Sequence, residues 1–179
     1  MSVNARRLAA ATLATGVIAG LVGLACIHLL HWIQALAWDM HGGTLLEAAS
    51  AVSPTRRILV LTLGGVIGAL SWFLLFRRNK AITSVSAAVD GTPMPPLRAT
   101  WHALTQVLIV GLGASVGREV APREMAAAFS AAAADRLGLS AEDRRIIVAC
   151  GAGAGQAAVY SIPLSGAVYP LEIPLVSRS

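Results

Sequence analysis

Charged residues are scarce in this chain. Only 13% of its 179 residues are Asp, Glu, Lys or Arg, and its mean hydropathy is +0.69. Soluble domains carry roughly 25% charged residues, so this shortage excludes an ordinary soluble domain. Residues 8–38 and residues 58–76 contain no charged side chain at all. A bilayer core is crossed by about 20 apolar residues in a helix, and both stretches are therefore predicted to span a membrane.

Cysteine and the usual catalytic groupings are also rare or missing. Cys26 and Cys150 lie in apolar surroundings, which predicts two buried thiols rather than a disulfide framework. His28 and His31 are three residues apart, but two imidazoles without a nearby carboxylate or Cys cluster make a poor metal site. We find no Ser-His-Asp set, zinc spacing or phosphate loop. We therefore expect no enzyme, no metal and no cofactor.

The excess of basic residues does not indicate a nucleic-acid partner. The net charge is +5, but the basic residues lie at the ends of apolar runs, with Arg6 and Arg7 before the first and Arg77, Arg78 and Lys80 after the second. Under the positive-inside rule this pattern places the N-terminus and the 77–80 cluster in the cytoplasm. Residues 39–56 are then expected outside, in a multi-pass protein of a bacterial plasma membrane.

The apolar segments change character after residue 80. Most of those that follow are too short to cross a bilayer alone: residues 104–116, 125–134, 146–160 and 162–176. Interrupted helices at membrane depth are tolerated where protein or a water-filled cavity surrounds them, and in transporters they mark the substrate site. We therefore predict an all-α membrane protein, a single domain over 1–179, with two long spans followed by short, tilted or broken helices over 81–176.

Small residues and helix caps support this interpretation. Four glycine pairs are spaced by four residues, which lets membrane helices approach closely: Gly16 and Gly20, Gly64 and Gly68, Gly113 and Gly117, and Gly151 and Gly155. Ser140 precedes Ala141-Glu142-Asp143 and is predicted to cap a helix. Ser161, followed by Pro163, is predicted to cap another.

Two arginines and two glutamates lie close together in the stretch GREVAPREM, residues 117–125, between two apolar segments. Pro122 fits the first turn of a helix, because the first N–H groups have no partner within the helix. A helix is therefore predicted to start near Gly117–Arg118, with free N–H groups and the positive end of its dipole available to an anion. Glu119 would act there as a tethered anion. The alternative is that Arg118, Glu119, Arg123 and Glu124 are simple surface charges at a helix start.

Two motifs resemble one known family. GREVAP, followed by GAGAGQAAVYSIPLSGAVYPLEI, is similar to the paired motifs of the chloride channel and chloride/proton antiporter (CLC) family, over essentially all of 8–176 but only as the N-terminal half of the family's inverted repeat. The resemblance implies chloride held by helix N-termini and a gating glutamate that competes for the anion position. Glu119 matches that glutamate, and Gly117, Arg118 and Val120 match the neighbours whose N–H groups would face the anion.

The sequence departs from the family at other positions. The family's GSGIP motif falls on Asn79–Thr83, so Lys80 replaces the anion-contacting serine while Ile82 keeps its place. Lys80 would either raise the local anion concentration or extend to the cytoplasmic interface. Of two glutamates that end the last motif, Glu172 matches the first, and Ile173 replaces the proton-transferring second. Glu172 is thus a weak candidate for a proton path.

We therefore expect a membrane protein that moves an anion, with chloride or another halide and the lipid bilayer as partners. The transport is expected to be channel-like or weakly proton-coupled. One alternative is a truncated or split half-protein with no transport of its own, and another is an exporter of another halide such as fluoride. Because the family's second half is missing and the sequence ends soon after an apolar segment, we expect residues 1–179 alone neither to fold stably nor to conduct. A second half-repeat or a second copy, in a dimer, would be needed.

Overall fold

The computed structural model describes residues 3–77 and 82–172, and within these ranges the regular structure is entirely α-helical. The predicted all-α class is confirmed. The helices are α1 (Val3–Trp38), α2 (Leu45–Ala51), α3 (Pro54–Phe76), α4 (Val85–Val89), α5 (Pro96–Gly111), α6 (Val120–Arg136), α7 (Ala141–Tyr160) and α8 (Pro163–Glu172).

The two predicted spans correspond to α1 and α3. Both end where the uncharged runs end, at Trp38 and Phe76, but both begin four or five residues earlier than those runs. For α3 the earlier start has a local cause, because Ser53 accepts a hydrogen bond from the N–H of Arg56 and Pro54 occupies the first turn. At 1.5 Å per residue, α3 is about 35 Å long, enough for a hydrocarbon core of about 30 Å.

The surface of α3 is apolar and largely uncovered. Only 17% of its most hydrophobic window is buried, and large side chains such as Ile58, Leu70 and Phe73 are more than half exposed. Polar residues would be expected at such positions in water. An exposed apolar helix of this length is suited to lipid or to a further membrane-embedded partner.

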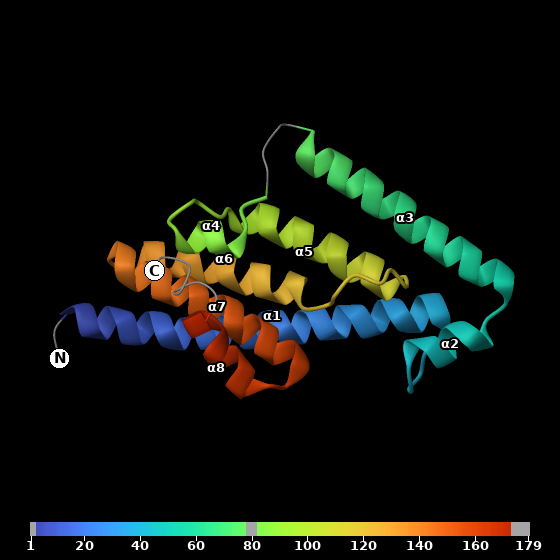
Figure 1. Ribbon diagram of the computed structural model, residues 1–179, viewed down its shortest axis with the longest axis horizontal. Helices are drawn as coiled ribbons and strands as arrows, with labels where there is room; N and C mark the ends of the chain where they lie inside the picture. The colour runs from blue at the N-terminus through green and yellow to red at the C-terminus, as the bar shows by residue number, and fades with distance from the viewer. Residues whose placement is uncertain (1–2, 78–81, 173–179) are drawn as a thin grey trace.

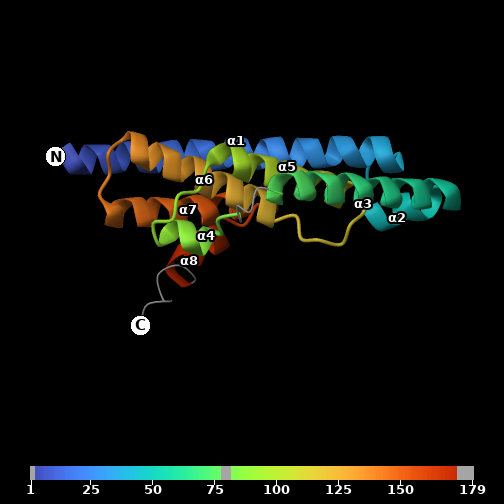
Figure 2. The same cartoon turned by 90° about the horizontal axis from the view of Figure 1, so that it is seen from above.

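Several of the later helices gather on the N-terminal half of α1. Figure 1 shows α1 along most of the length of the molecule and α3 returning from α2 at an angle to it, while α4, α6, α7 and α8 lie toward the N-terminal half of α1. The view from above gives the same arrangement (Figure 2). Helices α5, α6 and α7 pack against α1, and α3 packs against α5.

Most of the helices after residue 81 are short, as predicted. Helices α5 and α6 have 16 and 17 residues and α8 has ten, so they are about 24, 26 and 15 Å long. Helix α7 is the exception, because its 20 residues give a length of about 30 Å. Residues 90–95 connect α4 to α5. Ser140 caps α7 by accepting from the N–H of Asp143, which confirms the predicted cap.

The glycine pairs have different roles. Gly64 and Gly68 lie against Leu112 and Ile109 where α3 meets α5, and Gly151 and Gly155 lie against α6, so close helix approach is confirmed at both pairs. Gly16 and Gly20 are exposed on α1, with no atom within 4 Å of an added Cβ.

The prediction for Gly113 and Gly117 is wrong, because they do not share a helix. Gly113 lies just after α5 with a φ of 99°, in the left-handed region that favours glycine, and it turns the chain out of that helix.

Candidate anion site

The site is built where the chain leaves α5 and enters α6. The indole N–H of Trp38 donates to the carbonyl of Gly111 at 3.0 Å, which attaches the end of α5 to the end of α1. After a loop, α6 begins at Val120 with Glu119 as its N-cap residue. Gly117 and Arg118 therefore lie in the loop, and the predicted start at Gly117–Arg118 is two to three residues too early.

Proline explains this difference. A helix that began at Gly117 or Arg118 would need an N–H from residue 122 for the carbonyl of Arg118, and proline has none. With the start at Val120, Pro122 is the third helical residue, whose N–H would lack a partner in any case. The first intrahelical bond then runs from the N–H of Arg123 to the carbonyl of Glu119, at 3.3 Å. The N–H groups of Val120 and Ala121 remain without intrahelical acceptors.

Helix α7 holds this helix start inside the protein. Ala121 is 1% exposed and Pro122 is fully buried. On α7, Gly155 lies directly against the carbonyl of Pro122, and an added Cβ there would also come within 2.7 Å of the Cβ of Ala126. One turn earlier, Gly151 packs against Ser130. The glycine-rich stretch of α7 therefore lets the two helices approach closely and fixes the position of the α6 N-terminus.

Glu119 is half-buried at this helix start and has a specific partner. The hydroxyl of Tyr160, at the end of α7, donates a hydrogen bond to Oε2 of Glu119 at 2.9 Å. The carboxylate also lies against Gly117, where a side chain would overlap it. A negative charge next to a helix N-terminus is electrostatically favoured, as the sequence predicts for Glu119.

Arg118 adds a positive charge to the same place. Its guanidinium carbon lies 4.9 Å from the centroid of the Tyr160 ring, within the range of a cation–π contact. Tyr160 therefore contacts both charged residues of the motif, the cation through its ring and the anion through its hydroxyl. The sequence predicts the two charges but gives no indication of this shared partner, which lies 41 residues beyond Glu119.

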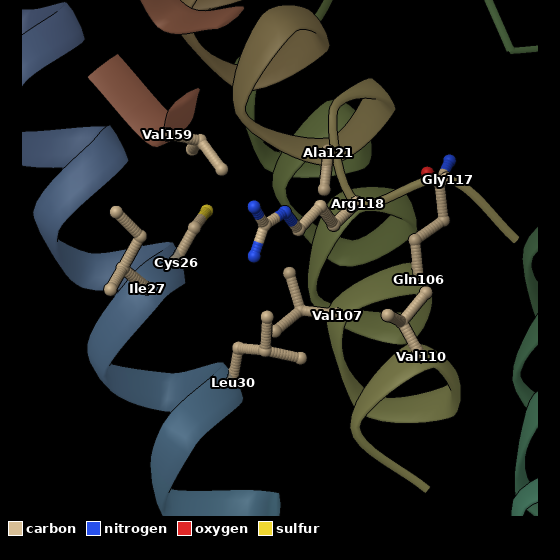
Figure 3. Close-up of a pocket in the computed structure, with 10 residues that line it drawn as sticks. All are labelled: Cys26, Ile27, Leu30, Gln106, Val107, Val110, Gly117, Arg118, Ala121 and Val159. Carbon is tan, nitrogen blue, oxygen red and sulfur yellow. The ribbon is translucent and has the colours of Figure 1, made fainter. Parts of the chain in front are cut away.

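A narrow pocket lies beside Gly117 and Arg118. In Figure 3 the side chain of Arg118 extends across it toward Cys26 on α1, and the amide of Gln106 rises from α5 toward the loop at Gly117. The other lining side chains are apolar, and the space accommodates about one water-sized group. Cys26 is a free, buried thiol, as predicted, whereas Cys150 is free but only partly buried.

The cap predicted at Ser161 is wrong. Ser161 is the residue that ends α7, in the left-handed conformation with φ 55° and ψ 39°, and α8 starts two residues later at Pro163. Pro163 is the first residue of α8. The left-handed residue reverses the chain so that α8 packs back on α7, where Gly153 lies against Gly166 and Pro170.

The structure does not bring every predicted residue to this site. Ile82 lines a separate pocket, together with Thr83 and Arg98. Lys80 lies outside the described residues, as do the side chain of Glu172 and all of Ile173.

A buried polar cluster next to the pocket was not predicted. Nδ1 of His102, on α5, lies 2.7 Å from Oε2 of Glu124 on α6, and the two side chains are only 15% and 13% exposed. The interpretation of Glu124 as a surface charge is therefore wrong. Gln106 lies one turn beyond His102 and contacts its ring. The sequence contains one indication of this cluster, because the polar residues His102 and Gln106 are spaced by four within a largely apolar segment.

Comparison with known proteins identifies the family of this chain. A sequence profile described as "Voltage gated chloride channel" matches residues 64–179. Proteins named "Voltage-gated ClC-type chloride channel ClcB" are similar over 173 residues: those of Escherichia coli O81 (strain ED1a) and Shigella boydii serotype 18 are each 30% identical, and that of Citrobacter koseri is 32% identical.

Each of these alignments covers 94% of this chain and 41% of the relative, so the chain spans less than half the length of the curated relatives it matches. No solved structure matches. The profile match covers more than half of the chain, and on this ground the protein belongs to the voltage-gated chloride channel family.

Proposed function

We propose that this chain forms one half of an anion pathway through a membrane, with chloride as the anion and the N-terminus of α6 as its binding element. One observation carries the proposal: the Glu119 carboxylate is held by the Tyr160 hydroxyl at 2.9 Å, at a helix start flanked by the Arg118 guanidinium. A carboxylate in such a place can stand in for the transported anion. The names of the relatives, which describe them as chloride channels, favour chloride.

Glu119 acts as the gate in this proposal. The N–H groups of Val120 and Ala121, the helix dipole and Arg118 together favour negative charge, but two anions at this short range repel each other. The Glu119 carboxylate and a chloride ion therefore compete for the same position. When Glu119 is protonated or turns away from Tyr160, the anion takes its place, and when the carboxylate returns, the pathway closes.

A second set of helix ends completes the coordination. A partly desolvated anion at this helix start without further partners would face a penalty of many kcal/mol. We propose that a second half-repeat, on another chain or a longer one, or a second copy of this chain supplies the rest. The exposed apolar face of α3 is available for such contacts.

Anion transport in this assembly is weakly coupled or uncoupled to protons through residue 173, where the family's proton-transferring glutamate would lie. Ile173 has no group that binds a proton, and Glu172, one residue before it, would point about 100° away on an ideal helix. Liposomes with an outward chloride gradient measure this directly. Uphill proton movement that depends on Glu172 would contradict the uncoupled mechanism.

Reconstitution tests the function itself. The purified chain is placed in liposomes alone, and together with the region of the Escherichia coli relative that the chain does not match, and the efflux of chloride, fluoride and gluconate is recorded. We expect chloride efflux from the combined sample and none from monomeric chains. Efflux from monomers would refute the need for a second half, and a folded assembly without efflux of any anion would indicate a non-transporting subunit. Efflux of fluoride in preference to chloride would reassign the anion.

A further inference from the structure

The cluster of His102, Gln106 and Glu124 has a second polar end that faces the pocket. Gln106 is 5% exposed, its amide nitrogen lies near the His102 ring, and its Oε1 is buried without a hydrogen-bond partner. Gln106 also lines the pocket beside Gly117 and Arg118 (Figure 3). Leaving a buried carbonyl oxygen unpaired is unfavourable, so its presence at a pocket needs a functional reason.

The hydrogen bonds of His102 define what Gln106 can do. Nδ1–H of His102 donates to Oε2 of Glu124 at 2.7 Å. The amide nitrogen of Gln106 lies 3.0 Å from Nδ1 and 3.3 Å from Nε2 of the same ring, so it sits over the face of the imidazole. In this state of the cluster the amide N–H₂ faces the imidazole and the oxygen faces away from it. Because the pocket side then presents an acceptor, this state disfavours an anion.

Protonation of the His102 ring reverses the orientation that the Gln106 amide prefers. An imidazolium carries a positive charge, so its face repels the partly positive N–H₂ group of Gln106. A half-turn about the terminal torsion of Gln106, which is a soft rotation, places Oε1 over the charged ring and swings the N–H₂ to the pocket side. The buried oxygen then faces a positive charge, and the pocket gains a donor next to Arg118.

We infer that His102 is a proton-binding site linked to anion binding, in which a proton on its imidazole turns the Gln106 amide and adds an N–H donor to the pocket at Gly117 and Arg118. This inference rests on the proposed anion role of that pocket. It does not use Glu119, and it gives the chain a proton-linked step that needs no titratable group at residue 173.

The charged surroundings of His102 are few. Glu124 on α6 is its ion-pair partner, and Arg98, one turn earlier on α5, donates to the carbonyl of Leu75 at 3.1 Å and has a further contact. From α3, the ring of Trp72 lies 6.3 Å from that of His102, and residues 58–76 and 8–38 bring no charge. Arg118 stays charged throughout, so His102 and Glu124 are the ionisable side chains that face each other in this cluster.

Histidine NMR tests the link without relying on flux. The full chain, labelled with ¹³C-histidine, is placed in lipid nanodiscs with its complementary half where folding requires it, and His102 is titrated in chloride and in gluconate at equal ionic strength. The His102 signal is the one lost in His102→Gln. Because coupling is reciprocal, chloride should raise the pH midpoint of His102. An affinity change of about 5-fold, the lower end of usual coupling, gives a shift of about 0.7 pH unit.

Two variants separate the parts of the mechanism. Gln106→Met keeps an unbranched side chain of similar length without an amide, so His102 should still titrate but with the same midpoint in both anions. His28→Gln, at an exposed position on α1, should leave the chloride shift unchanged. Glu124→Gln should lower the midpoint in both anions. It is a second way to perturb the cluster if Gln106→Met does not fold.

The outcomes distinguish this inference from the proposed function. Equal midpoints in chloride and gluconate for the unmodified chain would overturn the inference, as would a chloride shift that survives in Gln106→Met. Chloride efflux with no shift would leave the anion pathway standing and remove only the link. A shift without efflux would support the link and count against transport.

Discussion

The hydroxyl of Tyr160 donates a 2.9 Å hydrogen bond to the carboxylate of Glu119, which joins the end of α7 to the start of α6. The ring of the same tyrosine lies under the Arg118 guanidinium. One side chain therefore holds both charges of the motif, with the carboxylate beside the helix start. The proposed closed state depends on this contact.

Tyr160→Phe should weaken the closed position of Glu119. The ring keeps its contact with Arg118, but the hydrogen bond to the carboxylate is lost, which costs about 1.5–3 kcal/mol for a charged acceptor. Chloride efflux at neutral pH should therefore rise while the helical content stays the same. Unchanged efflux in a folded Tyr160→Phe assembly would show that the tyrosine does not hold the gate.

Gly155→Ala should disturb both folding and transport. A Cβ at this position would overlap the carbonyl of Pro122, so α6 and α7 must move apart, at a cost of about 1–3 kcal/mol. The matched control is Gly20→Ala on α1, where an added Cβ meets nothing within 4 Å. Thermal unfolding in detergent and chloride efflux measure the two effects. Equal stability of the two variants would contradict the close contact.

Residues 39–56 should lie outside the cell, with the N-terminus in the cytoplasm. A cysteine at Thr44, which precedes α2 and is exposed, should react with a membrane-impermeant thiol reagent added from outside. A cysteine at Ala5, near the other end of α1, should react only after the membrane is opened. Labelling of the Thr44 position only from the cytoplasm would reverse this topology.

The start of α2 should depend on pH through Glu47. The backbone N–H of Thr44 donates to its carboxylate at 2.8 Å, and this bond, with the Thr44 side chain, holds the pKa of Glu47 below its ordinary value of 4.5. A lowered folded pKa means that the stabilisation is complete above pH 4.5 and is lost as the pH falls through the folded pKa.

Helical chemical shifts of Leu45–Ala51 should therefore decrease in acid and recover at neutral pH. Glu47→Gln keeps a side chain that can complete the capping box but has no carboxyl group to titrate, so its shifts should be insensitive to pH in this range. A loss of helix in acid that is equal in both proteins would assign the effect to another group.

Residue patterns predicted the helices better than their ends. Uncharged runs depend on local chemistry, so α1 and α3 follow from the sequence, and the later apolar segments overlap α5, α6, α7 and α8, although α7 is longer than predicted. Helix α6 starts at Val120 and not at the predicted Gly117–Arg118, because Pro122 has no N–H to donate to the carbonyl of Arg118. Ser161 ends α7 instead of starting α8, since a serine before a proline suits either role until the fold sets its backbone.

The site contacts could not be predicted in the same way. Glu119 and Arg118 stand out as charges in an apolar region, but Tyr160 meets them only because α7 packs against the start of α6. His102 and Glu124 lie on different helices, 22 residues apart, and their pairing depends on how α5 packs against α6. Such contacts depend on how the helices pack in three dimensions, and no local spacing of residues in a single sequence indicates them.

The pH dependence of chloride efflux in Glu119→Gln is the most direct measurement of the gate. The combined assembly is reconstituted with and without this change, at saturating chloride so that anion binding does not limit the rate, and efflux is recorded from acid to alkaline pH. The unmodified assembly should respond to pH, because protonation removes the competing carboxylate, whereas Glu119→Gln should conduct at the same rate at every pH. A full pH response in Glu119→Gln would contradict the assignment of Glu119 as the gate.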